Sequence, residues 1–292
     1  MNAPVVSIVI RCRDEARHLG PVLAGVLAQQ GAPPFEVVAL DSGSTDGTLE
    51  VLARHPVRVE HLAAGDFTYG RALNVGAAHA RGVLVVYLSA HCRPLDPTWL
   101  AVLVAPFADP AVTATFGRQV PLPGVNPIEA LATARNFPPA APAGVLFSTA
   151  NGAVRRAAVL ARPFDEAIPI AEDHVWALGV VAPERIAYVP DAAVGHSHPM
   201  GLRHWHARFF AHGLAAEYAR RRRGLELPWG AGEGSAGQIA RSRAGAFLQL
   251  ARTLARQGEG RALAHLPAYA LARTRSFARG VKEGARRYGR AT

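Results

Sequence analysis

The stretch VLVVYLSAHCRP, residues 83–94, is an apolar run that ends abruptly in polar residues. Its β-branched and aromatic side chains are typical of a strand that is buried on both faces. Three earlier runs have the same character and cover residues 5–12, 35–40 and 57–62. Segments with helical spacing lie between the runs, at residues 19–30, 45–55 and 69–80. This alternation predicts an α/β fold with a doubly wound, mostly parallel sheet flanked by helices.

Polar residues close these runs, and they are the first candidates for a site. In a doubly wound sheet, ligands bind beyond the carboxyl ends of the strands. The first run closes in RCRDEA (11–16) and the second in LDSGSTDGT (40–48). In the second, Asp41 stands at the strand end, glycines permit a tight turn, and a Ser or Thr can cap the next helix. Taken alone, that segment is also typical of an ordinary capped turn.

The composition of the chain indicates a folded protein with a preference for anionic partners, but it does not indicate which anionic partner. The 292 residues carry a formal net charge of +10, and half of them are hydrophobic. That is enough for a substantial core, in one large domain or in one domain with an appendage. Arginine supplies almost all of the positive charge, because Lys282 is the only lysine. Such an excess favours anionic partners such as phosphates, acidic lipids or nucleic acid.

The chain has no run of about 18 uncharged apolar residues, and PVVSIVI follows its start without a basic leader. We therefore expect neither a membrane-spanning helix nor a signal peptide, and a cytoplasmic location. Cys12 and Cys92 are too few for a disulfide framework, so two reduced thiols are expected.

The polar segments form an ordered series: RCRDEA, DSGSTDGT, FTYGRALNVGAAHARG (67–82) and SAHCRP. This series resembles the nucleotide-binding half of family 2 glycosyltransferases, which have the GT-A fold. The likeness extends over about residues 5–200 and implies transfer of a sugar from a nucleotide sugar. FTYGRALN and the Ser-Ala-His form are similar to a rhamnosyltransferase-like branch of the family.

The resemblance implies a set of residues that bind the donor. In the family, the acid at the end of the second strand contacts the nucleotide base, which corresponds to Asp41, with Asp14 beside the same pocket. A carboxylate suits this task, because uracil and thymine offer an imide N–H donor. We add Arg11, Ser42 and Ser89 to the donor set.

Arg71 lies on one predicted helical face with Asn74 and Ala78. Two explanations of Arg71 stay open. It is either a solvated surface arginine or a clamp on the donor diphosphate, whose oxygens a guanidinium binds with a planar fork.

The fourth run departs from the family pattern. Family members usually carry an Asp-any-Asp motif here, whose last acid holds a divalent cation, but this chain has Ser89, Ala90 and His91. His91 could ligate Mg or Mn, hydrogen-bond a phosphate, or be a satisfied turn histidine. Hard cations prefer oxygen ligands, so we expect only a weak dependence on a divalent cation. A zinc site of Cys12, Cys92 and His91 is conceivable, but we do not expect it.

Later segments of the sequence offer candidates for binding the acceptor, the donor sugar and a metal ion. ATFGRQVPLPG (114–124) offers Arg118 and Gln119 for acceptor binding, and STANGAVRR (148–156) resembles the family segment that lines the donor sugar, with Asn151 as the candidate. YVPDAAVGHSH (188–198) resembles the strand that returns to the donor. Its His196 is the second candidate metal ligand, ahead of His198, although loop histidines alone are often ordinary.

Glu172 and Asp173 precede an apolar helical pattern. By themselves they fit acids that complement a helix dipole, and within the series they match the family's Glu-Asp motif. Attack of a sugar hydroxyl on the anomeric carbon needs a general base and stabilisation of the leaving phosphate. We expect Asp173 to be the base and Glu172 to orient the base or the acceptor. A single displacement inverts the anomeric configuration.

We expect residues 1–200 to form the glycosyltransferase domain and residues 201–292 a basic, amphipathic helical extension. Two explanations of the extension stay open: its helices pack on the catalytic domain, or they dock on the anionic inner face of the cell membrane. The second would suit a lipid-linked acceptor.

The sequence thus predicts an inverting glycosyltransferase of cell-envelope polysaccharide synthesis. It would move rhamnose or another hexose from a UDP- or dTDP-sugar to a glycan or lipid-linked acceptor. The alternative is a non-catalytic nucleotide-sugar-binding scaffold, suggested by the lost acid pair; nucleic-acid binding is not expected, because the Glu-Asp motif is intact. We expect Asp41, Arg71, His91 and Asp173 to converge on one cleft.

Overall fold

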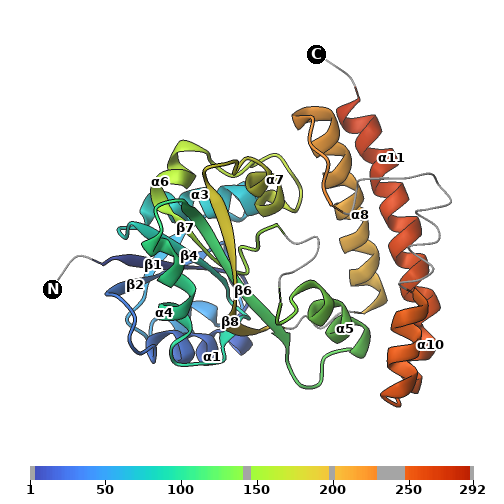
Figure 1. Ribbon diagram of the computed structural model, residues 1–292, viewed down its shortest axis with the longest axis horizontal. Coiled ribbons are helices and arrows are strands. Elements are labelled where there is room, and N and C mark those ends of the chain that lie inside the picture. The colour runs from blue at the N-terminus through green and yellow to red at the C-terminus, as the bar shows by residue number, and fades with distance from the viewer. Residues whose placement is uncertain (1–3, 141–145, 197–200, 229–246, 290–292) are drawn as a thin grey trace. The chain divides into compact units, whose positions relative to one another are not determined.

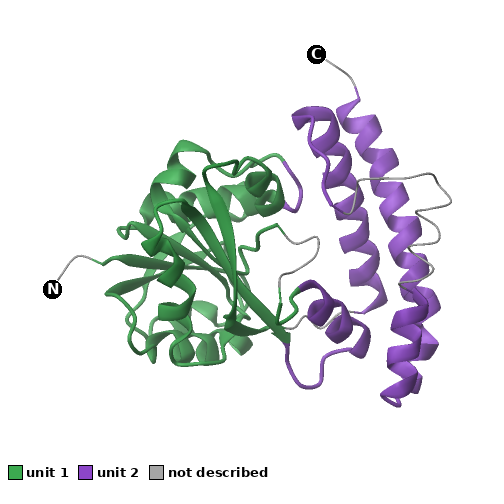
Figure 2. Cartoon of the chain, in the orientation of Figure 1, with its two compact units in different colours: residues 1–120, 137–167, 172–196 green, residues 121–136, 168–171, 197–292 purple. Residues whose placement is uncertain are grey.

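The computed structural model describes residues 4–140, 146–196, 201–228 and 247–289. These residues belong to two compact units, shown in different colours in Figure 2. Unit 1 comprises residues 1–120, 137–167 and 172–196, and unit 2 comprises residues 121–136, 168–171 and 197–292. We expected the extension to begin at residue 201; in the structure, two segments from earlier in the chain belong with it.

Unit 1 is built on one sheet of eight strands in the order β3-β2-β1-β4-β7-β6-β8-β5 (Figure 1). The strands are β1 (Val6–Cys12), β2 (Phe35–Asp41), β3 (Arg58–His61), β4 (Leu84–Ser89), β5 (Arg93–Pro94), β6 (Val112–Pro121), β7 (Asn151–Arg155) and β8 (Arg185–His196). The first four pair in parallel, and β7 runs antiparallel to both β4 and β6. Strands β1, β2, β3, β4 and β6 therefore point the same way, and the predicted α/β fold with a mostly parallel sheet is confirmed.

Helices cover both faces of this sheet. They are α1 (Ala16–Leu27), α2 (Thr48–Leu52), α3 (Tyr69–His79), α4 (Trp99–Val104), α6 (Arg156–Ala161) and α7 (Glu172–Leu178), with short 3₁₀ turns η1 (Ala64–Asp66) and η2 (Ala105–Ala108). The side chains of β1 alternate between two cores, as a buried strand requires. Ile8 and Ile10 pack with α1, α2 and α4, whereas Val9 packs with α3, α6 and α7.

Close approach of α3 to the sheet depends on a glycine. A Cβ on Gly76 would lie 2.5 Å from Cγ1 of Val9. The α3 helix begins after Thr68, whose hydroxyl accepts a hydrogen bond from the Arg71 N–H at 3.1 Å. Arg71 therefore lies in the first turn of α3, the helix that packs closely against β1.

The helix predicted at residues 45–55 is shorter in the structure. It is α2, and it begins only at Thr48, because the preceding residues form a turn with Gly43 and Gly47 at positive φ. These left-handed conformations suit glycine and prevent an earlier helix start. Conversely, α1 starts three residues earlier than the predicted 19–30.

Unit 2 is helical. It contains α5 (Pro127–Asn136), α8 (Leu202–Tyr218), α10 (Gly260–Leu271) and α11 (Phe277–Tyr288), a helical stretch at residues 247–256, and π-helical turns η3 (Ala219–Arg223) and η4 (Ala272–Ser276). Trp205 of α8 packs in its core, and its indole N–H donates to Glu129 of α5 at 2.5 Å. Gly213 of α8 and Gly280 of α11 let these two helices approach closely. No helix in the described part of the chain is long and apolar enough to span a membrane.

The packing of β6 yields a stability prediction. A Cβ on Gly117 would overlap the carbonyl oxygen of Ala192 and the side-chain amide of Asn151. Gly117→Ala should therefore lower the free energy of unfolding by about 2–3 kcal/mol, because the backbone cannot yield without moving β8. Chemical denaturation measures this.

Gly65→Ala is the matched control, because a Cβ at that residue meets no atom within 4 Å. Its effect should stay within about 0.5 kcal/mol. Equal stability of the two variants would contradict the packing argument.

Candidate active site

The candidate site lies at the edge of the sheet where parallel strands end. In register, Arg11 of β1 pairs with Ser89 of β4, and Cys12 pairs with Asp41 of β2. Three of the predicted donor residues, Arg11, Asp41 and Ser89, therefore share this edge. The strand pairing brings them together although they are far apart in the sequence.

Arg11 occupies the centre of this edge. Its side chain is 14% exposed, and its Nη1 lies 3.9 Å from Oε1 of Glu172. The guanidinium carbon stands 5.7 Å from the centroid of the Tyr69 ring at the start of α3. Nη1 is buried and has no hydrogen-bond partner among the described residues. Arg11 is thus a buried cation with an unused donor, which suits an anionic ligand.

The Glu172–Asp173 pair opens α7, as the sequence predicted. Glu172 is 4% exposed, and its pKa is raised to about 7, mainly by burial and then by the charge of Asp173, while the charge of Arg11 opposes the rise. Asp173 is half-buried, and its Oδ2 accepts a hydrogen bond from the Thr149 N–H at 3.1 Å. Two adjacent carboxyl groups therefore differ in environment, which allows them different roles.

Asp41 and Asp14 are both held by the turn that follows β2. Oδ2 of Asp41 accepts from the N–H groups of Gly43 and Ser44 at 3.0 and 3.2 Å, and Oδ1 accepts from the Ser44 hydroxyl. Oδ1 of Asp14 accepts from the Thr45 N–H at 2.8 Å. A carboxylate oxygen has two lone pairs, so Oδ1 of Asp41 retains acceptor capacity for an imide N–H, although the side chain is only 2% exposed.

Ser42 is buried, and its hydroxyl donates to the carbonyl oxygen of Cys12 at 3.3 Å. This bond fixes the end of β2 to the end of β1. Ser89 is half-buried, and its carbonyl oxygen accepts a hydrogen bond from the Cys92 N–H at 2.8 Å. Both serines therefore shape the loops of the site.

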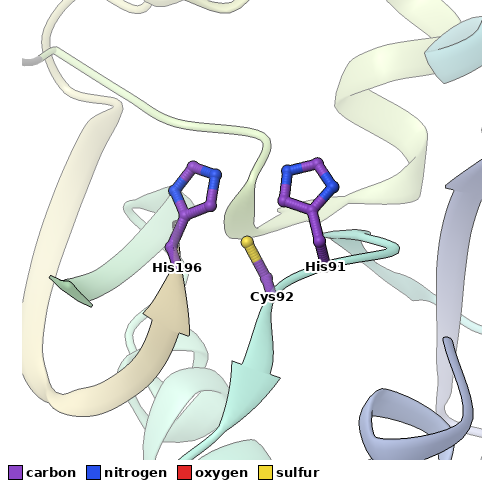
Figure 3. Close-up of side chains that lie close together, drawn as sticks. All are labelled: His91, Cys92 and His196. Carbon is purple, nitrogen blue, oxygen red and sulfur yellow. The ribbon is translucent and has the colours of Figure 1, made fainter. Parts of the chain in front are cut away.

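His91 and His196 come together in the structure. Their rings stack with centroids 5.1 Å apart and planes at 24°. Nδ1 of His91 lies 2.8 Å from Oε1 of Glu15, and Nδ1 of His196 lies 2.5 Å from Oε1 of Gln119. Figure 3 shows that the other nitrogen of each ring faces the opposite ring.

Cys92 completes this cluster. Its side chain is fully buried, and burial raises the pKa of its thiol. The ligand atoms of His91, Cys92 and His196 all lie within 4.8 Å of one another. Cys12 is not part of the group, because its Sγ faces the carbonyl oxygen of Leu40 at 3.7 Å. The conceivable zinc site of Cys12, Cys92 and His91 is thus replaced by a different trio.

Among the described residues, the ion-pair partner of Arg71 is Glu166 and not one of the other predicted donor residues. Its side chain is 45% exposed, and Nη1 lies 3.8 Å from Oε2 of Glu166. Asn74 also bonds to Glu166, and to the backbone of Phe164. Arg71 thus pairs with a neighbouring loop, and the expected convergence of Asp41, Arg71, His91 and Asp173 on one cleft stays a prediction.

The acceptor candidates lie on β6. Gln119 is buried between His196 and Ser148, to whose hydroxyl its Nε2 donates at 2.9 Å. Arg118 is half-buried, and its Nε is buried with no hydrogen-bond partner among the described residues. His198 lies outside the described residues.

Asn151, the candidate for the donor sugar, is 0% exposed. Its Oδ1 accepts from the Trp99 indole N–H at 3.0 Å, and its Nδ2 donates to the carbonyl oxygens of Arg118 and Ala192 at 3.2 and 2.9 Å. Asn151 thus joins β7 to β6, β8 and α4. Its direct contact with a donor stays a prediction.

Sequence reasoning missed Glu15, Tyr69 and Thr149, which contact His91, Arg11 and Asp173. Glu15 had a signal, because it stands directly after Asp14 in the polar segment that closes β1. Tyr69 and Thr149 gave none, since only the fold brings them to their partners.

A cavity of about 380 Å³ lies elsewhere in unit 1, near Phe35, Arg58 and Arg81. Phe35 is the first residue of β2 and Arg58 the first of β3, so this cavity is at the opposite edge of the sheet. Arg58 is paired with Glu36 and Glu60 there. The chemistry-bearing residues and this cavity are therefore separate.

Comparison with known proteins identifies the chain. The family model described as glycosyl transferase family 2 matches residues 7–151, a span that includes Arg11, Asp41 and the His91 segment. The chain belongs to glycosyl transferase family 2. This confirms the family resemblance, and the protein is a glycosyltransferase.

The relatives of this glycosyltransferase include two from Salmonella. The O-antigen chain rhamnosyltransferase RfbN of Salmonella typhimurium strain LT2 is 27% identical over 217 residues, which are 68% of this chain and 68% of the relative. The O-antigen chain rhamnosyltransferase WbaN of Salmonella anatum is 28% identical over 203 residues, or 64% of each chain.

Among solved structures, the glycosyltransferase is similar to mannosyltransferase PcManGT from Pyrobaculum calidifontis, which was solved in complex with GDP-Man and Mn²⁺. The TM-score is 0.61 at 22% identity, and the match covers 93% of this chain and 87% of that one. This likeness concerns the fold, and it confirms the predicted GT-A type.

The buried carboxyl group predicts how the stability of the glycosyltransferase depends on pH. The pKa of Glu172 in the folded chain, about 7, exceeds its ordinary value of 4.5, so the folded state holds a proton that the unfolded state has lost between these values. Stability should therefore fall as pH rises from 4.5 to 7. Glu172→Gln removes this loss, and at pH 8 the variant should be more stable by roughly 3 kcal/mol.

Thermal or chemical unfolding across pH 4.5–8 measures the stability of the wild type and of Glu172→Gln. The difference in stability between the two proteins should vanish near pH 4.5. The solvent-exposed Glu50→Gln is the control and should follow the wild type. Parallel curves for wild type and Glu172→Gln would show that the buried carboxyl is not protonated as described.

Proposed function

We propose that this glycosyltransferase is an inverting enzyme that transfers a deoxyhexose such as rhamnose from a dTDP- or UDP-sugar. The acceptor would be a glycan or a lipid-linked glycan of the cell envelope. The two Salmonella relatives are O-antigen chain rhamnosyltransferases, which supports this sugar and this class of acceptor. The observation that carries the proposal is the meeting of Arg11 and the Glu172–Asp173 pair at the carboxyl edge of the sheet.

Asp173 takes the role of general base in this proposal. It is the half-buried member of the acid pair, whereas Glu172 is enclosed and sits against Arg11. The Thr149 N–H fixes one oxygen of Asp173, which orients the carboxylate for a proton on an acceptor hydroxyl. The proton moves to Asp173 as the hydroxyl oxygen bonds to the anomeric carbon and the nucleoside diphosphate leaves.

Arg11 and the His91 segment take the role of stabilising the leaving diphosphate. Arg11 offers a buried guanidinium donor, and His91 and His196 stand near the same strand ends. Charge that develops on the leaving oxygen is best stabilised by donors that are already in place. Asp41 and Asp14 would recognise the base, and Arg118 and Gln119 the acceptor.

We propose a divalent cation at His91 and His196, with weak dependence on added Mg²⁺ or Mn²⁺. The neighbour from Pyrobaculum contains Mn²⁺ with its nucleotide sugar, but neither acid of the Asp-any-Asp motif stands at this position here. Complete inactivation by EDTA that low-micromolar Mn²⁺ alone restores would contradict the weak dependence.

The test of the function is sugar transfer together with donor binding. We expect UDP-, dTDP- and GDP-sugars to differ in thermal stabilisation of the chain, with the dTDP- or UDP-sugar strongest, and that donor to release its diphosphate when an acceptor is present. Asp173→Asn should lower turnover by about 100-fold or more and keep the thermal shift with donor. The exposed Asp191→Asn is the control.

Near-normal turnover in Asp173→Asn would exclude Asp173 as the base. Donor binding without transfer to any acceptor would instead support the scaffold alternative. Preference for a GDP-sugar would overturn the proposed donor.

We also propose that unit 2 docks on an anionic membrane surface. Arg279, Lys282 and Arg286 are exposed and lie three and four residues apart on α11, which places them on one face of that helix. Each basic residue near an anionic leaflet contributes about 1 kcal/mol of attraction. Such docking would bring the enzyme to a lipid-linked acceptor at the inner face of the membrane.

Flotation with vesicles containing anionic lipid tests this. Reversal of charge in Arg279→Glu/Lys282→Glu should weaken binding at least about tenfold. Arg17→Glu/Arg54→Glu makes the same charge change at exposed sites of unit 1 and should have little effect. Equal losses in both variants would indicate attraction by net charge, and no binding by the wild type would end the proposal.

A further inference from the structure

The ligand atoms of the His91 cluster are unlike those of a hard-cation site. Mg²⁺ and Mn²⁺ are bound mostly by carboxylate, carbonyl and water oxygens. The group formed by His91, Cys92 and His196 offers two imidazole nitrogens and one sulfur, all within 4.8 Å of one another. Glu15 is hydrogen-bonded to Nδ1 of His91 and is not a member of this group.

Both imidazole rings are oriented as metal-binding histidines usually are. An ionised Glu15 can only accept, so in the neutral form of His91 the proton lies on Nδ1 and the lone pair on Nε2. Gln119 donates through Nε2 to Ser148, which leaves its Oε1 to accept from Nδ1 of His196. A hydrogen bond from the second ring nitrogen to a carboxylate or carbonyl is the usual support of a ligating histidine. The two Nε2 atoms are the nitrogens that face each other in Figure 3.

Cys92 supplies the third ligand atom. It follows β4 by three residues, its side chain is fully buried, and Figure 3 shows the sulfur pointing toward the space between the two rings. Thiolate sulfur is a strong ligand for Zn²⁺ and a poor one for Mg²⁺ or Mn²⁺.

We propose that His91, Cys92 and His196 form a three-ligand site for a borderline-soft divalent cation of the Zn²⁺ class. Tetrahedral bonds of about 2.0–2.3 Å place ligand atoms about 3.3–3.6 Å apart, so the ligand atoms, which lie within 4.8 Å of one another, need to close by at most about 1.5 Å. On binding, the Cys92 thiol becomes a thiolate bonded to the cation, and its proton passes to solvent or buffer.

Three protein ligands leave one position of a tetrahedral cation open, as in catalytic rather than structural zinc sites. That position would take a phosphate oxygen of the donor. This last step rests on the proposed glycosyl transfer, whereas the cation site itself does not.

The test is direct metal binding by the full, chelator-treated chain without a histidine tag. Titration with Co²⁺ should give thiolate-to-metal charge-transfer absorption with a stoichiometry of one, and Zn²⁺ should displace the Co²⁺. Isothermal titration should show Zn²⁺ binding far more tightly than Mn²⁺ or Mg²⁺. Cys92→Ser should abolish the charge-transfer band and weaken Zn²⁺ binding at least about 100-fold.

Cys12→Ser is the matched control, because Cys12 is the other buried thiol and lies outside the group. It should keep the band and the affinity. His196→Asn changes a half-buried residue and should weaken Zn²⁺ binding while keeping the band, since the sulfur remains. Circular dichroism verifies the fold of each variant.

X-ray absorption at the zinc edge keeps the proposal testable if Cys92→Ser does not fold. The wild-type chain should show one sulfur at about 2.3 Å and nitrogen at about 2.0–2.1 Å. A shell of nitrogen and oxygen only, a charge-transfer band that persists in Cys92→Ser, or Mn²⁺ binding as tight as that of Zn²⁺ would overturn the site.

These outcomes are independent of sugar transfer. Zinc binding through Cys92 in a chain that transfers no sugar would uphold the site and refute the proposed function. Sugar transfer by a wild-type chain whose bound metal has no sulfur ligand would uphold the proposed function and refute the site.

Discussion

The parallel pairing of β1 with both β2 and β4 is the constraint on which the site depends. It sets Arg11 beside Ser89 and Cys12 beside Asp41, so three chain segments deliver their polar ends to one edge. A shift of one residue in either pairing would turn every side chain of that strand to the opposite face. Because the faces of β1 pack in two different cores, such a shift would bury the wrong side chains, and the register is strongly fixed.

Arg11 is the cationic side chain that this strand pairing places at the edge of the sheet. It is a cation held in a buried place by Glu172, by the Tyr69 ring and by its own strand. Burial beside Asp173 raises the pKa of Glu172 to about 7, so Glu172 can keep its proton near neutral pH. Asp173 is only half-buried and is the more accessible of the two acids. A single arginine thereby links the strand ends to the acid pair of α7, and the placement of one depends on the placement of the other.

The parallel strands β1 to β4 and the start of α7 could be predicted from the sequence, because β-branched runs and a Glu-Asp pair before an apolar helical pattern are local signals. The partners of the site residues could not. Arg71 meets Glu166, and Arg11 meets the Tyr69 ring, across stretches of chain whose approach is decided by tertiary packing. Cys92 lies in a turn beyond the strand end, where strand alternation no longer determines the direction of a side chain. The trio that the sequence made conceivable included Cys12, but this residue belongs to β1 and its Sγ faces the carbonyl oxygen of Leu40.

Asn151 illustrates how structure changes the meaning of a polar residue in a site. Its amide ties the indole of Trp99 to the carbonyl oxygens of Arg118 and Ala192, with every polar atom engaged and none exposed. If a substitution of Asn151 lowered activity, the cause would be misaligned β-strands beneath the site. Kinetic constants alone would not distinguish that loss of structure from weaker substrate binding.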